Sequence, residues 1–283
     1  MSQRRDLRMG IKQKVGVVIP ARNEQHNLKY TLDALMIQSV KPYQVIVVND
    51  GSTDKTVEIA KQHGCDVIDF PEAHDNWVTL PDLAKVKNLG FDLLHRDLDY
   101  MMILGADHIL PPDYIERIIE RMEKDPKLVV ASGSIQKEWS IIPRGSGRIV
   151  KNSFWLLIGA RYPVNWGYES WMISKANQLG YTVAHFDDIV TTVLRKTAIT
   201  YKPIMYYHYG KAMKALGSQW FYVLGRSLII IKRAGLASGW QFNKGYIQNK
   251  ADFYDDELRA FVKSKQQFSF KHIKNLINYL RHG

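Results

Sequence analysis

The 283-residue chain has a single cysteine, Cys65, and no apolar run long enough to cross a bilayer. One cysteine excludes an internal disulfide framework and any cysteine-rich zinc site, as is typical of a reducing compartment. The strongest apolar run, residues 220–231, falls short of the ~20 residues of a membrane-spanning helix. Residues 1–14 are basic and polar, without the apolar core of a signal peptide. We therefore expect a cytoplasmic protein.

Acidic residues are scarce relative to basic ones, with 28 Asp and Glu against 39 Lys and Arg and a formal net charge of +11. This imbalance predicts a face that meets an anion, such as a nucleotide phosphate, a nucleic acid or an acidic lipid surface. The composition, 46% hydrophobic and 24% charged, excludes a disordered or collagen-like chain. The chain is long enough for one large domain or two small ones.

Between residues 15 and 132, short apolar runs alternate with amphipathic stretches, which predicts an α/β domain with a mostly parallel sheet. Runs rich in Val, Ile and Met predict buried strands at 15–20, 43–49, 66–69, 100–104 and 128–131. Helical spacing of apolar residues predicts helices at 24–38, 54–63, 83–95 and 113–124. Each of the first four strands therefore ends in a loop that opens a helix.

Polar residues directly follow three of these strands, and in an open α/β sheet ligands bind beyond the carboxyl ends of the strands. The three groups are Pro20, Ala21, Arg22 and Glu24; Asn49, Asp50 and Gly51; and Gly105, Ala106, Asp107 and His108. Asp50 can accept hydrogen bonds from a base imide or a ribose hydroxyl. Taken alone, residues 50–54 are equally typical of a turn that caps a helix.

Three motifs, VVIPARNE, then VIVVNDGSTD, then ADHILPPD, resemble in order and spacing the inverting glycosyltransferase family 2, which has a GT-A fold. The resemblance covers roughly residues 14–195. It implies a Rossmann-like, mostly parallel sheet flanked by helices, and transfer of a sugar from a UDP- or GDP-sugar to a hydroxyl of a glycan or lipid-linked acceptor. We expect a basic arm at 1–14, a catalytic domain at 15–200 divided at residue 132 into nucleotide-sugar and acceptor halves, and a helical region at 201–283.

The resemblance also implies roles for single residues around the nucleotide. Those expected to contact the donor are Pro20, Ala21, Arg22, Glu24, Asn49, Asp50, Lys87, Ala106 and Asp107. Lys87, followed by Asn88 and Gly90, matches a basic-Asn-x-Gly pattern of the family; without the resemblance it indicates a solvated helix face.

A metal site is expected at Asp107. The family usually carries two aspartates around one residue, the DXD motif that holds Mn²⁺ or Mg²⁺, and here Gly105 replaces the first of them. Substrate phosphates and water can complete the oxygen shell of a hard divalent ion. His108 is either a nitrogen ligand, which favours Mn²⁺, or the hydrogen-bond partner of a neighbouring loop.

The catalytic base is expected at Glu169. Residues 167–170 resemble the family's Glu-Asp motif at the start of an acceptor-site helix, but Ser170 stands where the family has the Asp that is its usual base. Glu169 is also favourable beside the helix macrodipole, and the two roles are compatible. Asp187 and Asp188, after a strand expected at 181–186, are the reserve candidates.

Other side chains of the second half have two interpretations each. Arg195, His208 and Lys211 either add positive charge near the diphosphate or are surface charges. Four tryptophans either stack on sugar rings or belong to the core: Trp139, Trp155, Trp166 and Trp171. In residues 268–281, apolar side chains at Phe270, Ile273, Leu276, Ile277 and Leu280 lie opposite Lys271, Lys274 and Arg281. This face, with residues 220–231 as a second apolar surface, either attaches the protein peripherally to the inner face of the membrane or packs on the catalytic domain.

Two other classes of protein share some of these sequence features. A nucleic-acid-binding module is disfavoured, because no helix-turn-helix, zinc or RNA-recognition pattern is present and acidic residues lie where a phosphate groove needs basic ones. A catalytically impaired, glycosyltransferase-like nucleotide-binding protein stays open, because aspartates are missing at positions 105 and 170.

Overall fold

The computed structural model describes residues 13–72, 80–136, 142–195, 203–250 and 253–266. The chain divides into two compact units. The first consists of Met1–Ala73, Val86–Arg161 and Gly180–Arg195, and the second of His74–Lys85, Tyr162–Leu179 and Lys196–Gly283. The expected division at residue 200 therefore differs from this one, since part of the expected acceptor half belongs to the unit of the C-terminal helices. Trp139 and residues 268–281 lie outside the described residues.

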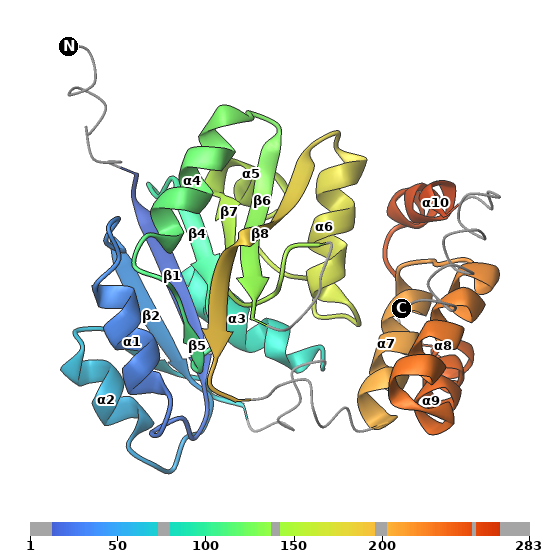
Figure 1. The fold of residues 1–283 in the computed structure, drawn as a ribbon, viewed down its shortest axis with the longest axis horizontal. Helices are drawn as coiled ribbons and strands as arrows, with labels where there is room; N and C mark the ends of the chain where they lie inside the picture. Colours follow the sequence, from blue (N-terminus) through green and yellow to red (C-terminus); the bar gives the residue numbers. More distant parts are fainter. Residues whose placement is uncertain (1–12, 73–79, 137–141, 196–202, 251–252, 267–283) are drawn as a thin grey trace. The chain divides into compact units, whose positions relative to one another are not determined.

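The first unit is built on an eight-stranded mixed sheet with the order β3-β2-β1-β4-β7-β6-β8-β5 (Figure 1). Its strands are β1 (Val15–Ala21), β2 (Gln44–Asn49), β3 (Asp66–Asp69), β4 (Tyr100–Ile103), β5 (His108–Ile109), β6 (Leu128–Ile135), β7 (Arg148–Lys151) and β8 (Thr182–Val193). Strands β1 to β4 pair in parallel, and so do β6 and β8. Strand β7 runs antiparallel to both β4 and β6, and β5 runs antiparallel to β8. Strands β1, β2 and β4, which precede the polar motifs, therefore end at the same edge.

Helices cover both faces of this sheet: α1 (Leu28–Met36), α2 (Thr56–Gln62), α3 (Asp82–Asp92), α4 (Tyr114–Lys124) and α5 (Asn152–Leu157). The apolar side chains of α1 and α4 form one cluster with Val17, Ile19 and Val47, which point to one face of the strands. Helix α3 packs on the opposite face, where Gly90 lies against Val18 and Val48. Strands β1, β2, β4 and β6 are therefore buried and covered on both sides, as predicted. The prediction of a buried strand at 66–69 is wrong in its burial, since β3 lies at the end of the sheet and has no buried residue.

Gly90 sets how closely α3 approaches the sheet. A Cβ atom at this position would lie 2.5 Å from Val18 Cγ1 and 2.8 Å from Val48 Cγ2. We expect Gly90→Ala to lower the free energy of unfolding by ~1 to 3 kcal/mol through overpacking, measured by urea denaturation. Val18→Ala in the same chain should recover part of that loss, because it opens the space that the new methyl group needs. An unchanged stability of the single variant would contradict this account of the packing.

Strand β8 is longer than expected, and this is a correction to the sequence analysis. The strand predicted to end at Phe186 continues to Val193, so Asp187 and Asp188 lie inside it and not in a loop after it. Gly133 pairs with Phe186 and Ser134 with Val190, which leaves three residues of β8 in a bulge. Asp188 accepts hydrogen bonds from Arg117 and Arg121 of α4. Two adjacent aspartates are unusual in a strand, and here arginines of a helix distant in sequence stabilise the bulge that holds them.

The second unit is helical among its described residues and contains α6 (Tyr168–Gln178), α7 (Pro203–Ala215), α8 (Trp220–Ala234), α9 (Leu236–Gln248) and α10 (Asp256–Lys265). Glycines bring these helices together: a Cβ at Gly245 of α9 would lie 1.9 Å from the carbonyl oxygen of Tyr207 in α7. Tyr254, just before α10, stacks on Trp171 of α6 and donates a hydrogen bond to the carbonyl of Trp166. Within the described ranges, every helix is too short or too polar to traverse a bilayer.

Candidate functional site

The loops that follow β1 and β2 are joined by a set of hydrogen bonds. The amide of Asn23 donates to Ser52 Oγ (3.1 Å), and Asn23 Oδ1 accepts from the amide of Thr53 (2.9 Å). The amide of Glu24 donates to Thr56 Oγ1 (2.7 Å). Asn23 has a positive φ of 53°, which asparagine tolerates better than most residues. The two motifs therefore fold as one platform at the strand ends.

Asn49 and Asp50 have different positions in this platform. The side chain of Asn49 donates to Asp69 Oδ1 (2.7 Å) and accepts from the amide of Ser52 (2.9 Å), so it holds the turn. The Asp50 amide is bonded to the carbonyl of Ala21 (2.9 Å), which ties the end of β2 to the end of β1. The structure thus places Asp50 beside Pro20, Ala21 and Arg22, as the sequence predicted for one edge, whereas Asn49 serves to position its neighbour.

Lys87 belongs to the same edge of the sheet. It lies one helical turn before Gly90 in α3 and so faces the sheet as Gly90 does. Helix α3 runs antiparallel to the strands that it covers, so the first residues of the helix lie nearer the carboxyl ends of those strands. Lys87 is only 5% exposed and Asn88 4%, which rules out the solvated helix face that the sequence left open.

The loop that carries Asp107 is held on three sides. The hydroxyl of Thr31 in α1 donates to the carbonyl of Ala106 (2.9 Å), and the amide of Leu194 donates to the carbonyl of Asp107 (2.8 Å). The amide of Gly105 donates to Ser146 Oγ (2.7 Å). Asp107 is therefore a fixed carboxylate, with its side chain 11% exposed.

The space of the family's first aspartate is taken by Ser146. A Cβ atom at Gly105 would lie 3.0 Å from Ser146 Oγ and 3.1 Å from Asp107 Oδ1. An aspartate at 105 would therefore crowd both groups. Ser146 comes from a segment distant in sequence, for which the sequence predicted no role, and its hydroxyl is held here by the Gly105 amide and by His108.

His108 has a structural position. Its Nδ1 lies 2.6 Å from Ser146 Oγ and its Nε2 lies 2.7 Å from Thr191 Oγ1. Thr191 donates its only hydroxyl proton to the carbonyl of Ser134, so it accepts from Nε2–H of the histidine, and Nδ1 then accepts from Ser146. Burial lowers the pKa of His108 to about 4, which agrees with this neutral ring. Of its two interpretations, the structure supports the hydrogen-bond partner and leaves neither ring nitrogen for a metal.

Arg195 bridges the first and third motifs. Its guanidinium contacts Glu24 Oε1, and its Nε lies 3.2 Å from Asp107 Oδ2. Pairing of β8 with β5 and the Leu194 hydrogen bond bring Arg195 beside Asp107. Burial raises the pKa of Glu24. The hydrogen bond from Asn27 and the charge of Arg195 oppose that shift, whereas the charge of Asp107 adds to it. Two carboxylates thus share one guanidinium, and the group is net negative.

The carboxylate oxygens of this group suit a divalent cation that would take most of its ligands from a diphosphate. Among the residues that the structure describes, no three His, Cys, Asp or Glu side chains gather as a metal site. Mn²⁺ and Mg²⁺ are commonly bound by one or two carboxylates together with substrate phosphates, and Asp107 supplies such a carboxylate. A negative group of carboxylates also needs a further cation before it admits an anionic diphosphate.

The three carboxylates predicted for catalysis have separate surroundings. Glu169 lies in the first turn of α6 in the second unit, half-buried, behind Gly167 with a φ of 76°. Asp188 is paired with two arginines, and the Arg121 hydrogen bond lowers its pKa to about 2, which makes it a weak base. Asp187 is paired with His185 (3.2 Å) and 84% exposed. Glu169 therefore keeps the role proposed for it, and no observation favours the reserve candidates.

The remaining candidates of the second half fall mostly into the core. Trp155 packs on Phe91 and Trp171 on Tyr254, and both are buried. His208 is buried against Trp166, and burial followed by the charge of Lys211 lowers its pKa, so it is neutral at pH 7. It therefore adds no positive charge.

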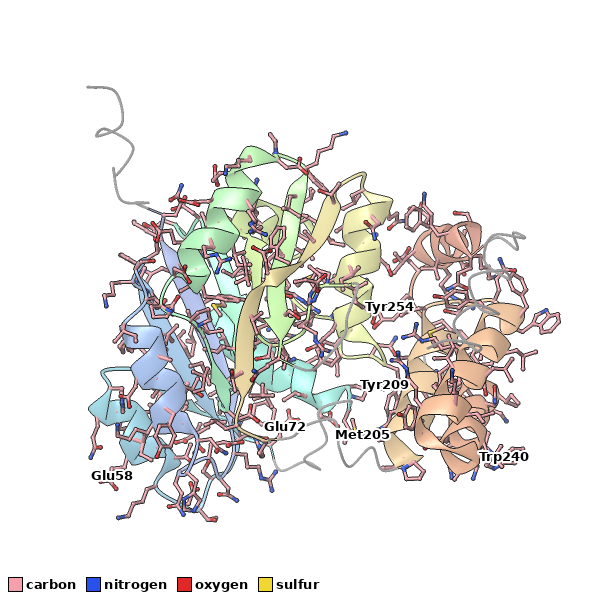
Figure 2. The ribbon with its side chains drawn as sticks, viewed as in Figure 1. Glu58, Glu72, Met205, Tyr209, Trp240 and Tyr254 are labelled. Atoms are coloured by element: carbon pink, nitrogen blue, oxygen red, sulfur yellow. The ribbon has the colours of Figure 1, made fainter. Side chains whose placement is uncertain are left out.

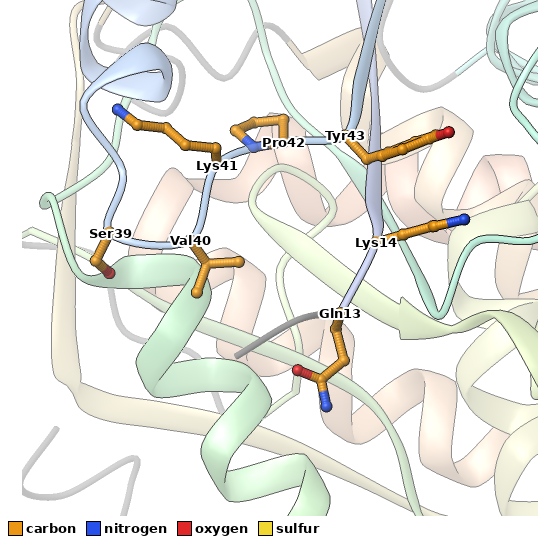
Figure 3. Close-up of a pocket in the computed structure, with 7 residues that line it drawn as sticks. All are labelled: Gln13, Lys14, Ser39, Val40, Lys41, Pro42 and Tyr43. Atoms are coloured by element: carbon orange, nitrogen blue, oxygen red, sulfur yellow. The ribbon is translucent and has the colours of Figure 1, made fainter. Parts of the chain in front are cut away.

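A separate hollow lies at the amino ends of β1 and β2, opposite the polar motifs (Figure 3). Lys14, Lys41, Pro42 and Tyr43 line it. Lys14 is paired with Asp97 and lies over the ring of Tyr43, while Lys41 donates to the carbonyl of Met36. Its cations serve local contacts, so we place the functional site at the carboxyl ends.

Comparisons with known proteins find glycosyltransferases among the relatives of this chain. Over 122 residues the chain is 28% identical to a poly-beta-1,6-N-acetyl-D-glucosamine synthase of Staphylococcus epidermidis, which is 42% of this chain and 28% of that protein. Over 59 residues it is 42% identical to a 4,4'-diaponeurosporenoate glycosyltransferase of Staphylococcus aureus, which is 21% of this chain and 16% of that protein. The chain thus spans less than a third of the length of either relative.

Solved structures share the fold. The mannosyltransferase PcManGT of Pyrobaculum calidifontis, in complex with GDP-Man and Mn²⁺, superposes with a TM-score of 0.58 at 16% identity, over 95% of this chain and 80% of that one. Residues 1–349 of S. aureus TarS, in complex with UDP-GlcNAc, give 0.60 at 14% identity, over 94% and 89%. The expected GT-A fold is confirmed. The family model of glycosyl transferase family 2 matches residues 16–198, more than half of the chain, and the protein belongs to this family of glycosyltransferases.

Proposed function

We propose that this enzyme transfers a sugar from a UDP- or GDP-sugar to a hydroxyl of a glycan or lipid-linked acceptor, with inversion at the anomeric carbon. The observation that carries the proposal is the gathering of Glu24, Asp50, Lys87, Asp107 and Arg195 in the first unit, around the carboxyl ends of β1, β2 and β4. Except for Arg195, these charged residues are 4 to 8% exposed. Ionised groups are rarely buried to this extent unless a partner or a ligand meets them.

The nucleoside would bind on the platform formed by the loops after β1 and β2. Asp50 would accept hydrogen bonds from the base or the ribose, and Pro20, Ala21 and Arg22 would line the same pocket. Gly51 has a φ of 70°, with no atom near the position of a Cβ, so the backbone there admits a close ligand.

The diphosphate would lie between the platform and Asp107. Arg195 supplies a positive charge that can move from the carboxylates to the phosphates, because the guanidinium fork matches both groups. Asp107 would hold the divalent cation, which when bound neutralises charge on the departing diphosphate. Lys87, buried at the same edge, would contribute to donor binding.

The acceptor hydroxyl would attack the anomeric carbon on the side opposite the diphosphate. Its oxygen forms the new bond to that carbon while the bond to the diphosphate oxygen breaks. Glu169 would take the hydroxyl proton, as the resemblance of residues 167–170 to the family's acceptor helix implies. The nucleoside diphosphate then leaves with the bonding electron pair.

The donor site is tested by Asp50→Ala. We expect the Kd for UDP or GDP to rise by at least ~10-fold, because a hydrogen bond to a charged group is lost. Isothermal titration calorimetry on the folded variant measures it. Asp66→Ala removes a carboxylate from the amino end of β3, at the other end of the strands from Asp50, and should leave the Kd unchanged. An unaltered affinity in Asp50→Ala, or equal losses in both variants, counts against this donor site.

A further inference from the structure

Nearly all of the net positive charge comes from one part of the chain. Between positions 189 and 251 there are ten Lys or Arg residues and no Asp or Glu. This stretch includes α7, α8 and α9 of the second unit. Of the ten, the donor site uses only Arg195, which pairs with Glu24 and Asp107 in the first unit, so it does not account for the other nine.

The same helices expose large apolar side chains. In α9, Leu236 is 76% exposed, Trp240 70% and Ile247 74%; in α8, Trp220 is 65% exposed, Leu224 49% and Leu228 48%. The spacing of four residues in α8 puts its three residues on one stripe, and the spacings of four and seven do the same in α9. Figure 2 shows Trp240 projecting from α9 away from α7.

The two stripes form one face of a helical hairpin. Helices α8 and α9 are joined at Gly235. Along the seam between them, Ser227 and Ile231 of α8 pack against Gly239 and Asn243 of α9. Leu228 directly follows Ser227, and Trp240 directly follows Gly239, so both stripes border this seam. The opposite side of the hairpin packs on α7, where Phe242 and Gly245 of α9 meet Gly210 and Tyr207.

Basic residues continue both stripes. Lys232 follows Leu228 by four residues, and Lys244 follows Trp240 by four, and both are exposed. Arg226 and Arg233 of α8 are also exposed, and so is Lys250, two residues after the end of α9. Helices that lie in the headgroup layer of a bilayer typically combine tryptophan and leucine with lysine in this way.

We propose that this hairpin face, formed by Trp220, Leu224, Leu228, Leu236, Trp240 and Ile247, docks the enzyme on the surface of an anionic lipid bilayer. The positive charge of the hairpin favours an anionic bilayer over other occupants of this face. A second copy would bring two acid-free basic faces together, and residues 267–283 carry Lys271, Lys274 and Arg281 without an acidic residue. Anionic headgroups attract basic side chains while the apolar stripes enter the acyl boundary. Helix α8, with 15 residues or about 22 Å, lies along the surface and does not cross the ~30 Å core.

The experiment is vesicle flotation of the full chain with phosphatidylcholine vesicles, with and without phosphatidylglycerol, over a salt series. We expect binding to the anionic vesicles at low salt, and a loss of at least ~10-fold in affinity for L236S/W240S/I247S. The matched control, Y30S/I37S/L157S, removes apolar side chains that are 58 to 60% exposed on the first unit and should bind as the parent does. K232Q/R233Q/K244Q should weaken binding to anionic vesicles by roughly fivefold per residue.

Two further measurements separate docking from misfolding and from other attachments. UDP affinity and thermal melting should be unchanged in L236S/W240S/I247S, since exposed substitutions rarely alter stability. Brominated lipid should quench the tryptophan fluorescence of the parent, and less so that of Trp240→Phe. If I273S/L276S/L280S in the C-terminal segment abolishes binding while the hairpin variants retain it, the hairpin is not the docking face. Absence of vesicle binding by the parent overturns the proposal and leaves an acidic protein as the occupant.

Discussion

Glu169→Gln should lower kcat by ~10² to 10⁴-fold while the affinity for the nucleotide-sugar stays nearly constant. Glutamine keeps the size of the side chain and its hydrogen bonding but cannot accept the proton of the acceptor hydroxyl. Steady-state kinetics with donor and acceptor varied separately, together with calorimetry for the nucleotide, give both quantities.

A matched control comes from another helix of the same chain. Glu116 is also half-buried in the first turn of its helix, α4, so Glu116→Gln removes a carboxylate from an equivalent helix end. Both variants should lose a similar ~0.3 to 1 kcal/mol of stability through the helix dipole, and only Glu169→Gln should lose turnover. Retained turnover in Glu169→Gln would transfer the role to another base and end the proposal for this residue.

Asp107→Asn should reduce kcat by ~10² to 10³-fold, because it removes the carboxylate proposed to hold the divalent cation at the leaving diphosphate. Since phosphates would supply most of the ligands, Mn²⁺ should bind the parent weakly alone and more tightly with UDP, by linkage. In Asp107→Asn, the effect of UDP on Mn²⁺ affinity should shrink. Calorimetric titration of Mn²⁺ with and without UDP measures this independently of turnover.

Asp113→Asn is the control for this experiment. Asp113, the last residue of the ADHILPPD motif, directly precedes α4, is about half exposed and pairs with Arg117. Its replacement therefore removes a carboxylate of the same motif that is already paired with an arginine. Its Mn²⁺ titration should match that of the parent. Tight Mn²⁺ binding by the free parent protein, or full turnover of Asp107→Asn, would falsify the assignment of Asp107.

Local sequence sufficed for the first half of the fold. Strands β1 to β3 were predicted to within one residue at either end, because their apolar runs are continuous and bounded by Gly, Pro or charged residues. Helix α1 begins at Leu28, later than the predicted residue 24, because the carbonyl of Glu24 accepts from the amides of Asn27 and Leu28 in a preceding turn. Strands β5 and β7 were missed, since each is short and has its pairing partners far along the chain.

The motifs also predicted which residues follow the strands, and hence Glu24, Asp50 and Asp107 as one group, because parallel strands bring their carboxyl ends to one edge. The charge of Lys87 was visible, but its burial was not, since this depends on how closely Gly90 lets α3 approach Val18 and Val48.

Only the tertiary structure shows which residues surround the third motif where it departs from the family pattern. Ser146, distant in sequence, takes the space beside Gly105, and Thr191 of β8 completes the hydrogen bonds that hold His108 neutral. Likewise, Asp188 is occupied by arginines of α4, and Arg195 reaches Asp107 only because β8 pairs with β5. Each of these contacts joins residues separated by tens of positions. Periodicity and motif spacing describe neighbours along the chain, so they determine the strands and the residues at their ends, whereas the partners of those residues follow from how the sheet closes.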